Sequence, residues 1–86
     1  MPRISAFYGI VIAMFYEEHG VPHFHAQYAG QRASIAITDL DVLAGALPDR
    51  ALRLVREWAA LHRRELEENW SRARDHAPLQ PIVPLP

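Results

Sequence analysis

The sequence predicts an α+β domain in which an antiparallel sheet of three to four strands packs against one long C-terminal helix, followed by an extended proline-rich arm. Three observations support this prediction. Residues 3–47 are rich in β-branched and aromatic side chains, residues 48–75 repeat apolar side chains at spacings of three and four, and the last nine residues include four prolines. A chain of 86 residues can bury one modest core, so residues 1–86 are expected to form a single domain.

The first strand is expected over residues 4–16, where even and odd positions are both apolar. Such a strand is covered on both sides or lies inside a sheet. Gly9 interrupts it and suggests a bulge or a close approach of the backbone.

Two further strands are expected over residues 23–29 and 32–38, because polar and apolar side chains alternate there. The intervening Ala29-Gly30-Gln31 predicts a hairpin turn. Residues 39–47 fit either a short fourth strand or a turn of helix, since Gly45 would break a longer element.

The helix is expected to begin at Pro48 and to end near Arg74, because proline is favoured in the first helical turn and Pro78 cannot continue a helix. One apolar stripe on this helix comprises Leu52, Val55, Ala59, His62, Leu66, Trp70 and Ala73. Leu54, Trp58 and Leu61 form a second stripe beside it. Two stripes present more apolar surface than one small sheet can cover. The second stripe is therefore predicted to contact a small protein partner or another copy of the chain, with Trp58 as the exposed anchor. The arm, residues 76–86, is expected to pack along a sheet edge or against another chain.

Charge and composition exclude several classes of function. The formal charge of −1 lacks the basic excess typical of nucleic-acid-binding proteins, and without cysteine neither a disulfide nor a thiolate metal site can form. All nine basic residues are arginines, and seven of them lie between residues 50 and 74. Residues 49–75 also contain six acidic residues, which favours a solvated helix with ion pairs. The apolar run over residues 7–16 is too short to cross a membrane, so a cytoplasmic location is expected.

The candidate site is a histidine cluster, because His19, His23 and His25 lie within seven residues. Residues at i and i+2 of a strand point to the same side, so His23 and His25 could share one ligand. Neutral imidazoles bind transition metals, which makes zinc or nickel a candidate cofactor for a non-catalytic site of His19, His23 and His25. For the third ligand, Glu17, Glu18 and His62 are further candidates.

A second interpretation is acid–base cleavage of RNA. One neutral histidine of the His23 and His25 pair would take the proton of a 2′-hydroxyl, while the other, protonated, would supply one to the leaving oxygen. Arg3 or Arg32 would stabilise the added phosphoryl charge. A third interpretation is structural: the histidines satisfy the hydrogen bonds of a turn in a regulatory or interaction module. The sequence leaves these three open.

The sequence resembles a family of small bacterial proteins catalogued as a domain of unknown function, of the 4160 type. The resemblance rests on the opening PRIS-x-FYGI, on the PHFHA block over residues 22–26, on Leu47-Pro48 and on Glu57-Trp58-Ala59-x-Leu61-His62. It implies a stand-alone protein encoded beside another small protein, in an arrangement similar to toxin and antitoxin pairs, but it implies no activity. The leading prediction is therefore a component of a two-gene module that acts through a protein partner, whose toxin form would cleave or bind RNA with His23 and His25. The metal site and the interaction module are the alternatives. Two residues depart from the family pattern. Many members have proline or a polar residue where this chain has Val21, and an acidic residue near the position of Gln27.

Overall fold

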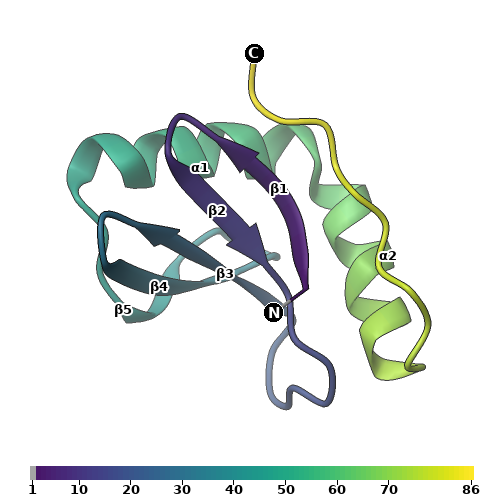
Figure 1. Ribbon diagram of the computed structural model, residues 1–86. Coiled ribbons are helices and arrows are strands. Elements are labelled where there is room, and N and C mark those ends of the chain that lie inside the picture. The colour runs from purple at the N-terminus through teal and green to yellow at the C-terminus, as the bar shows by residue number, and fades with distance from the viewer. Residues whose placement is uncertain (1) are drawn as a thin grey trace.

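The structure, a computed structural model, describes residues 2–86 and contains five strands followed by two helices (Figure 1). These elements are β1 (Arg3–Phe7), β2 (Ile10–Ala13), β3 (His23–Tyr28), β4 (Gln31–Ala36), β5 (Val42–Gly45), α1 (Asp49–Leu61) and α2 (Arg63–Arg74). The α+β class is as predicted, whereas the number of strands and helices differs from the prediction.

All five strands form one antiparallel sheet in the order β1-β2-β3-β4-β5, so each strand pairs with its neighbour in sequence. Figure 1 shows both helices on one side of this sheet, with α1 passing behind the strands. We call the covered side the helix face and the other side the open face. Buried side chains of the helix face form the core, among them Ile10, Ile12, Phe24 and Ile35.

The single strand predicted over residues 4–16 is in fact a hairpin. β1 and β2 are joined by Tyr8 and Gly9, whose φ angles of 50° and 80° are both positive. Two positive φ angles are what a two-residue turn needs to match the twist of the strands it joins. An aromatic residue at the first turn position concealed this turn, whereas the predicted turn at Ala29 and Gly30 has the same geometry, with φ of 49° and 81°.

The ambiguous segment 39–47 contains β5, which pairs with β4. The alternative of a helical turn is therefore wrong, and the sheet has one strand more than the upper limit predicted.

The prediction of one long helix over residues 48–75 is also wrong, because His62 leaves the helical conformation at φ −121° and ψ 27°. A straight helix over Asp49–Arg74 would be about 39 Å long at 1.5 Å per residue. The longest dimension of the molecule is 33 Å. The break lets α2 turn away from the α1 axis and cover the β1 side of the sheet (Figure 1).

Trp58 lies at the centre of the core, so the prediction that it is an exposed anchor is wrong. It is 0 % exposed, and its ring packs against Phe7 and Phe24 with centroid distances of 5.4 and 6.0 Å. Its indole N–H donates to the carbonyl oxygen of Val83 at 2.9 Å. Of the predicted second stripe, Leu54 is half-buried and Leu61 is exposed.

The C-terminal arm packs along the β1 edge and α2, in agreement with the first of its two predicted positions (Figure 1). The Ile82 N–H donates to the Ile4 carbonyl at 2.7 Å, and the buried Asn69 side chain binds both main-chain polar groups of Gln80. Covering an edge strand in this way removes a template for unwanted strand pairing. Within residues 2–86, neither helix combines the length and apolar character that a bilayer crossing requires.

Candidate metal centre

A row of paired residues crosses the open face of the sheet. Arg3 pairs with Ala13, Ala13 with His25, His25 with Ser34 and Ser34 with Ala44. Residues directly opposite each other in antiparallel strands point to the same face. His25 therefore lies in the middle of the row, with small side chains on both neighbouring strands.

His23 and His25 project from the same side of β3, as predicted from their i and i+2 spacing. Their ring centroids are 5.2 Å apart. His23 also contacts the helix layer, because its ring packs 5.2 Å from Trp70 of α2 and it is only 9 % exposed. α2 reaches this position because the helix breaks at His62.

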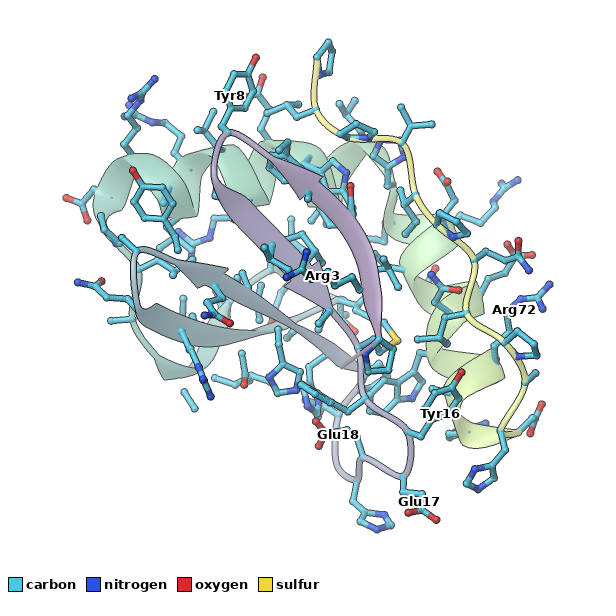
Figure 2. The ribbon with its side chains drawn as sticks, viewed as in Figure 1. Arg3, Tyr8, Tyr16, Glu17, Glu18 and Arg72 are labelled. Carbon is cyan, nitrogen blue, oxygen red and sulfur yellow. The ribbon has the colours of Figure 1, made fainter. Side chains whose placement is uncertain are left out.

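Glu18 completes the cluster from the loop over residues 14–22. Its Oε1 lies 2.6 Å from Nε2 of His25 and 3.6 Å from Nε2 of His23. Positive φ angles at Glu17 and Gly20, 62° and 91°, turn the loop back on itself. Figure 2 shows the result: Glu18 lies beside the sheet, whereas Glu17 points away from it.

The Nδ1 atoms of both histidines are also engaged. Nδ1 of His23 donates to the Val21 carbonyl at 2.8 Å, so the lone pair of the neutral ring is on Nε2. Nδ1 of His25 lies 3.3 Å from Oγ of Ser34, a hydroxyl that can donate or accept. Ser34 can therefore support either tautomer of His25.

The carboxyl group of Glu18 is ionised at neutral pH. Partial burial raises its pKa, but the hydrogen bond from His25 and the charges of His23 and His25 together lower it by more, so the pKa lies below the ordinary value of 4.5. The cluster thus combines one carboxylate with two imidazoles whose Nε2 atoms face it.

This donor set fits a transition metal. The three ligand atoms of Glu18, His23 and His25 all lie within 4.8 Å of one another. Ligands of a tetrahedral zinc lie about 3.3 Å apart when each bond is about 2.0–2.1 Å. The distance from Glu18 to His23 is close to that value, and the contact from Glu18 to His25 would lengthen by roughly 0.7 Å on this estimate.

The other predicted site residues do not join the cluster. His19 is exposed in the loop, so Glu18 occupies the position predicted for it. His62 instead pairs with Glu65 at 2.6 Å. Arg3 is exposed at the β1 end of the row, separated from His25 by Ala13.

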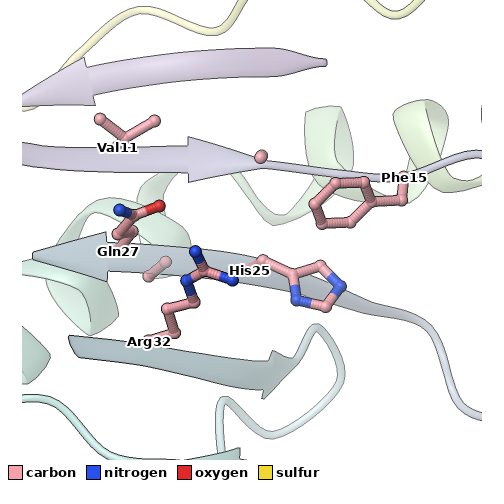
Figure 3. A pocket seen from close by; sticks show the side chains of 7 residues that line it. Val11, Phe15, His25, Gln27 and Arg32 are labelled. Atoms are coloured by element: carbon pink, nitrogen blue, oxygen red, sulfur yellow. The ribbon is translucent and has the colours of Figure 1, made fainter. Parts of the chain in front are cut away.

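A hollow on the open face adjoins His25 (Figure 3). It measures about 200 Å³ and is lined by Val11, Ala13, Phe15, His25, Ala26, Gln27 and Arg32. Arg32 is among the site residues predicted from the sequence, whereas Val11, Phe15 and Gln27 are not. The signal for them was available: residues 11, 13 and 15 alternate along a strand and point to the same side as His25.

Fold and site together define a small α+β protein with a five-stranded meander and a two-histidine, one-carboxylate cluster at the start of β3. The chain belongs to the family described as Domain of unknown function (DUF4160), whose family model matches residues 9–71. The predicted family resemblance is thereby confirmed, and the matched range includes the whole cluster. No curated protein and no solved structure matches the chain.

Proposed function

We propose that this protein binds a divalent transition metal, zinc or nickel, through Glu18, His23 and His25. The observation that supports this most directly is that the Nε2 atoms of His23 and His25 both lie near one carboxylate oxygen of Glu18, while both Nδ1 atoms contact other groups. Histidine ligands of metals are usually oriented in this way, through a hydrogen bond from the second ring nitrogen.

The donor types decide which metals suit the site. Two imidazole nitrogens favour Zn²⁺, Ni²⁺ and neighbouring ions, whereas Mg²⁺ and Ca²⁺ prefer oxygen ligands. Three protein ligands leave at least one coordination position for water or another molecule, as in catalytic zinc sites and unlike closed structural ones. The partly exposed side chains of Glu18 and His25 leave that position accessible.

The test is calorimetric titration of tag-free protein with Zn²⁺ and Ni²⁺, alongside Mg²⁺ as the hard-cation control. We expect one metal per chain, no measurable Mg²⁺ binding, and at least a tenfold loss of Zn²⁺ affinity in His25→Ala and in Glu18→Gln. His19→Ala is the matched control, because His19 lies next to Glu18 but outside the cluster. Equal affinity in wild type, His25→Ala and Glu18→Gln would refute the proposal.

A second candidate is an RNA-cleaving component of a two-gene module similar to toxin and antitoxin pairs. It is favoured by one observation: Arg32 and His25 line the same hollow. Against it, His23 is almost completely buried between His25 and Trp70, so only one of the two histidines can readily reach a ribose.

Expression in a bacterial host separates the two candidates. An RNA-cleaving toxin arrests growth, and both His25→Ala and co-expression of the adjacent gene relieve the arrest. Harmless accumulation of folded protein eliminates this candidate. Co-purification with the product of the adjacent gene would identify the protein partner that the family resemblance implies.

A further inference from the structure

The hollow beside His25 has an apolar floor where a solvent-facing sheet surface is normally polar. Val11 and Ala13 of β2 and Phe15 just beyond it line the hollow one after another on the open face. The open face of an antiparallel sheet usually carries polar side chains at these alternating positions. The Phe15 ring also meets the His25 ring edge-on at a centroid distance of 4.7 Å, which connects the apolar floor to the cluster.

Arg32 supplies the polar side of the hollow. Figure 3 shows its guanidinium group above the strands, between Gln27 and His25. Arg32 and Gln27 are directly opposite each other in the β3–β4 register. Within the part of the chain that the structure describes, Arg32 has no carboxylate within ion-pair distance. A guanidinium group offers two parallel N–H donors, which match the two oxygens of a carboxylate.

Size and charge limit what can bind here. A hollow of about 200 Å³ is smaller than the roughly 300–1,000 Å³ typical of sites for drug-sized ligands. The ionised Glu18 lies on the other side of His25, and Arg32 is the one arginine among the residues that line the hollow, so a ligand with many negative charges would be repelled. A single negative charge on a small apolar body fits best.

We propose that this hollow binds a small organic carboxylate, with the carboxylate on Arg32 and Gln27 and the apolar body on Val11, Ala13 and Phe15. Binding to the hollow requires no metal. Coupling between this hollow and the metal rests on the proposed function, because His25 contributes to both sites. If bound metal changes the affinity for the carboxylate, bound carboxylate must change the affinity for the metal by the same factor.

Benzoate is the probe, titrated against EDTA-treated protein and followed by amide chemical shifts. We expect saturable shifts at residues of β2, β3 and β4, and at least a tenfold weaker affinity in Arg32→Gln. Arg50→Gln is the matched control, since Arg50 is an exposed arginine of α1 outside this hollow. Arg32→Lys should recover part of the affinity, because it keeps the charge but loses the paired donors.

Four further ligands complete the test. Benzamide, which has the same ring without the charge, and acetate, which has the charge without the ring, should each bind at least tenfold more weakly than benzoate. Phenyl phosphate binding tenfold more tightly than benzoate would overturn the carboxylate assignment in favour of a phosphate ester. A short single-stranded RNA that competes with benzoate and binds more tightly than benzoate would overturn the carboxylate assignment in favour of nucleic acid.

The two proposals fail independently. Benzoate affinity that is unchanged in Arg32→Gln refutes the carboxylate site, whatever the metal titration shows. Carboxylate binding to the EDTA-treated protein with no zinc binding by the wild type refutes the metal centre and leaves the carboxylate site standing.

Discussion

The Ser34 hydroxyl can hydrogen-bond to His25 both in the metal-free cluster and in a metal-bound one. Without metal, Nε2 of His25 donates to the Glu18 carboxylate, so Nδ1 of the neutral ring accepts from the Ser34 hydroxyl. With a metal on Nε2, the ring proton must lie on Nδ1, and the Ser34 hydroxyl must then accept. A rotating hydroxyl can do both, so Ser34 can hold the His25 ring in place while its proton moves.

Replacing Ser34 by alanine should therefore weaken zinc binding by about tenfold or somewhat more, the range typical of groups that support a ligand. Calorimetric titration measures the change, and unchanged thermal unfolding would show that the fold is intact. Ser71→Ala on the exposed side of α2 is the control. Equal zinc affinity in the two variants would mean that Ser34 does not orient His25.

Glu18 should make stability depend on pH in the acid range. Because the folded-state pKa lies below the unfolded value near 4.5, the stabilisation that Glu18 contributes is complete above that value and is lost as the pH falls through the folded-state pKa. Denaturant unfolding at a series of pH values from 6 downward checks this. Wild type should lose more free energy of unfolding than Glu18→Gln on acidification, and parallel curves would contradict the argument.

Part of the site was predictable from the sequence. The i and i+2 spacing of His23 and His25 was enough to place both rings on one side of a strand. The third member was not decidable, because Glu17, Glu18 and His19 are consecutive in an irregular loop. Which of them faces β3 depends on the backbone angles at Glu17 and Gly20, and no periodicity reports those angles.

Among the elements, β5 packs against β4 with unusually close backbone contact. A Cβ atom at Gly45 would lie 2.1 Å from the Arg32 carbonyl oxygen, and the φ of +75° is itself unfavourable for other residues. Arg32 also lines the hollow, so this contact positions the strand that carries the proposed carboxylate-binding residue.

Gly45→Ala should therefore be strongly destabilising, and Gly20→Ala is its matched control. Both glycines have positive φ, but a Cβ atom at Gly20 meets nothing within 4 Å. Gly20→Ala should lose only the cost of the backbone conformation, about 1–2 kcal/mol. Chemical denaturation should give a clearly larger loss for Gly45→Ala, and equal losses would show that β5 shifts to relieve the clash.

The helices illustrate the limit of periodicity at the element scale. The spacing of apolar residues across His62 continues without interruption, so it predicts one helix. A straight helix would be longer than the molecule, and the bend at His62 lets Leu66, Trp70 and Ala73 of α2 reach the core.

In the whole molecule, the arm is held by buried side chains of both helices. Asn69 is fully buried; its amide nitrogen donates to the Gln80 carbonyl at 2.9 Å, and its oxygen accepts from the Gln80 N–H at 2.8 Å. Together with the bond from Trp58 to Val83, this pair attaches the arm to both helices.

Asn69→Ala should lower the free energy of unfolding by about 2–4 kcal/mol, because it removes two buried hydrogen bonds and leaves the main-chain groups of Gln80 without partners. Gln80→Ala is the control: its side chain is exposed and the bonds involve only its main chain, so it should be nearly neutral. Denaturant unfolding compares the two variants. Similar small losses for both would mean that water replaces Asn69 and that the arm is not held by this residue.

Residue types and their spacing were sufficient to predict the α+β class, the meander of strands before the helical segment, the second hairpin, the arm and the side-by-side histidines. These depend on residue types and on periods of two and 3.6, which act locally. Tertiary structure decided the break at His62, the burial of Trp58, the choice of Glu18 over His19 and the hollow beside His25. Each of these depends on the distance between elements and on loop backbone angles, which are settled only when the sheet, helices and arm pack against one another.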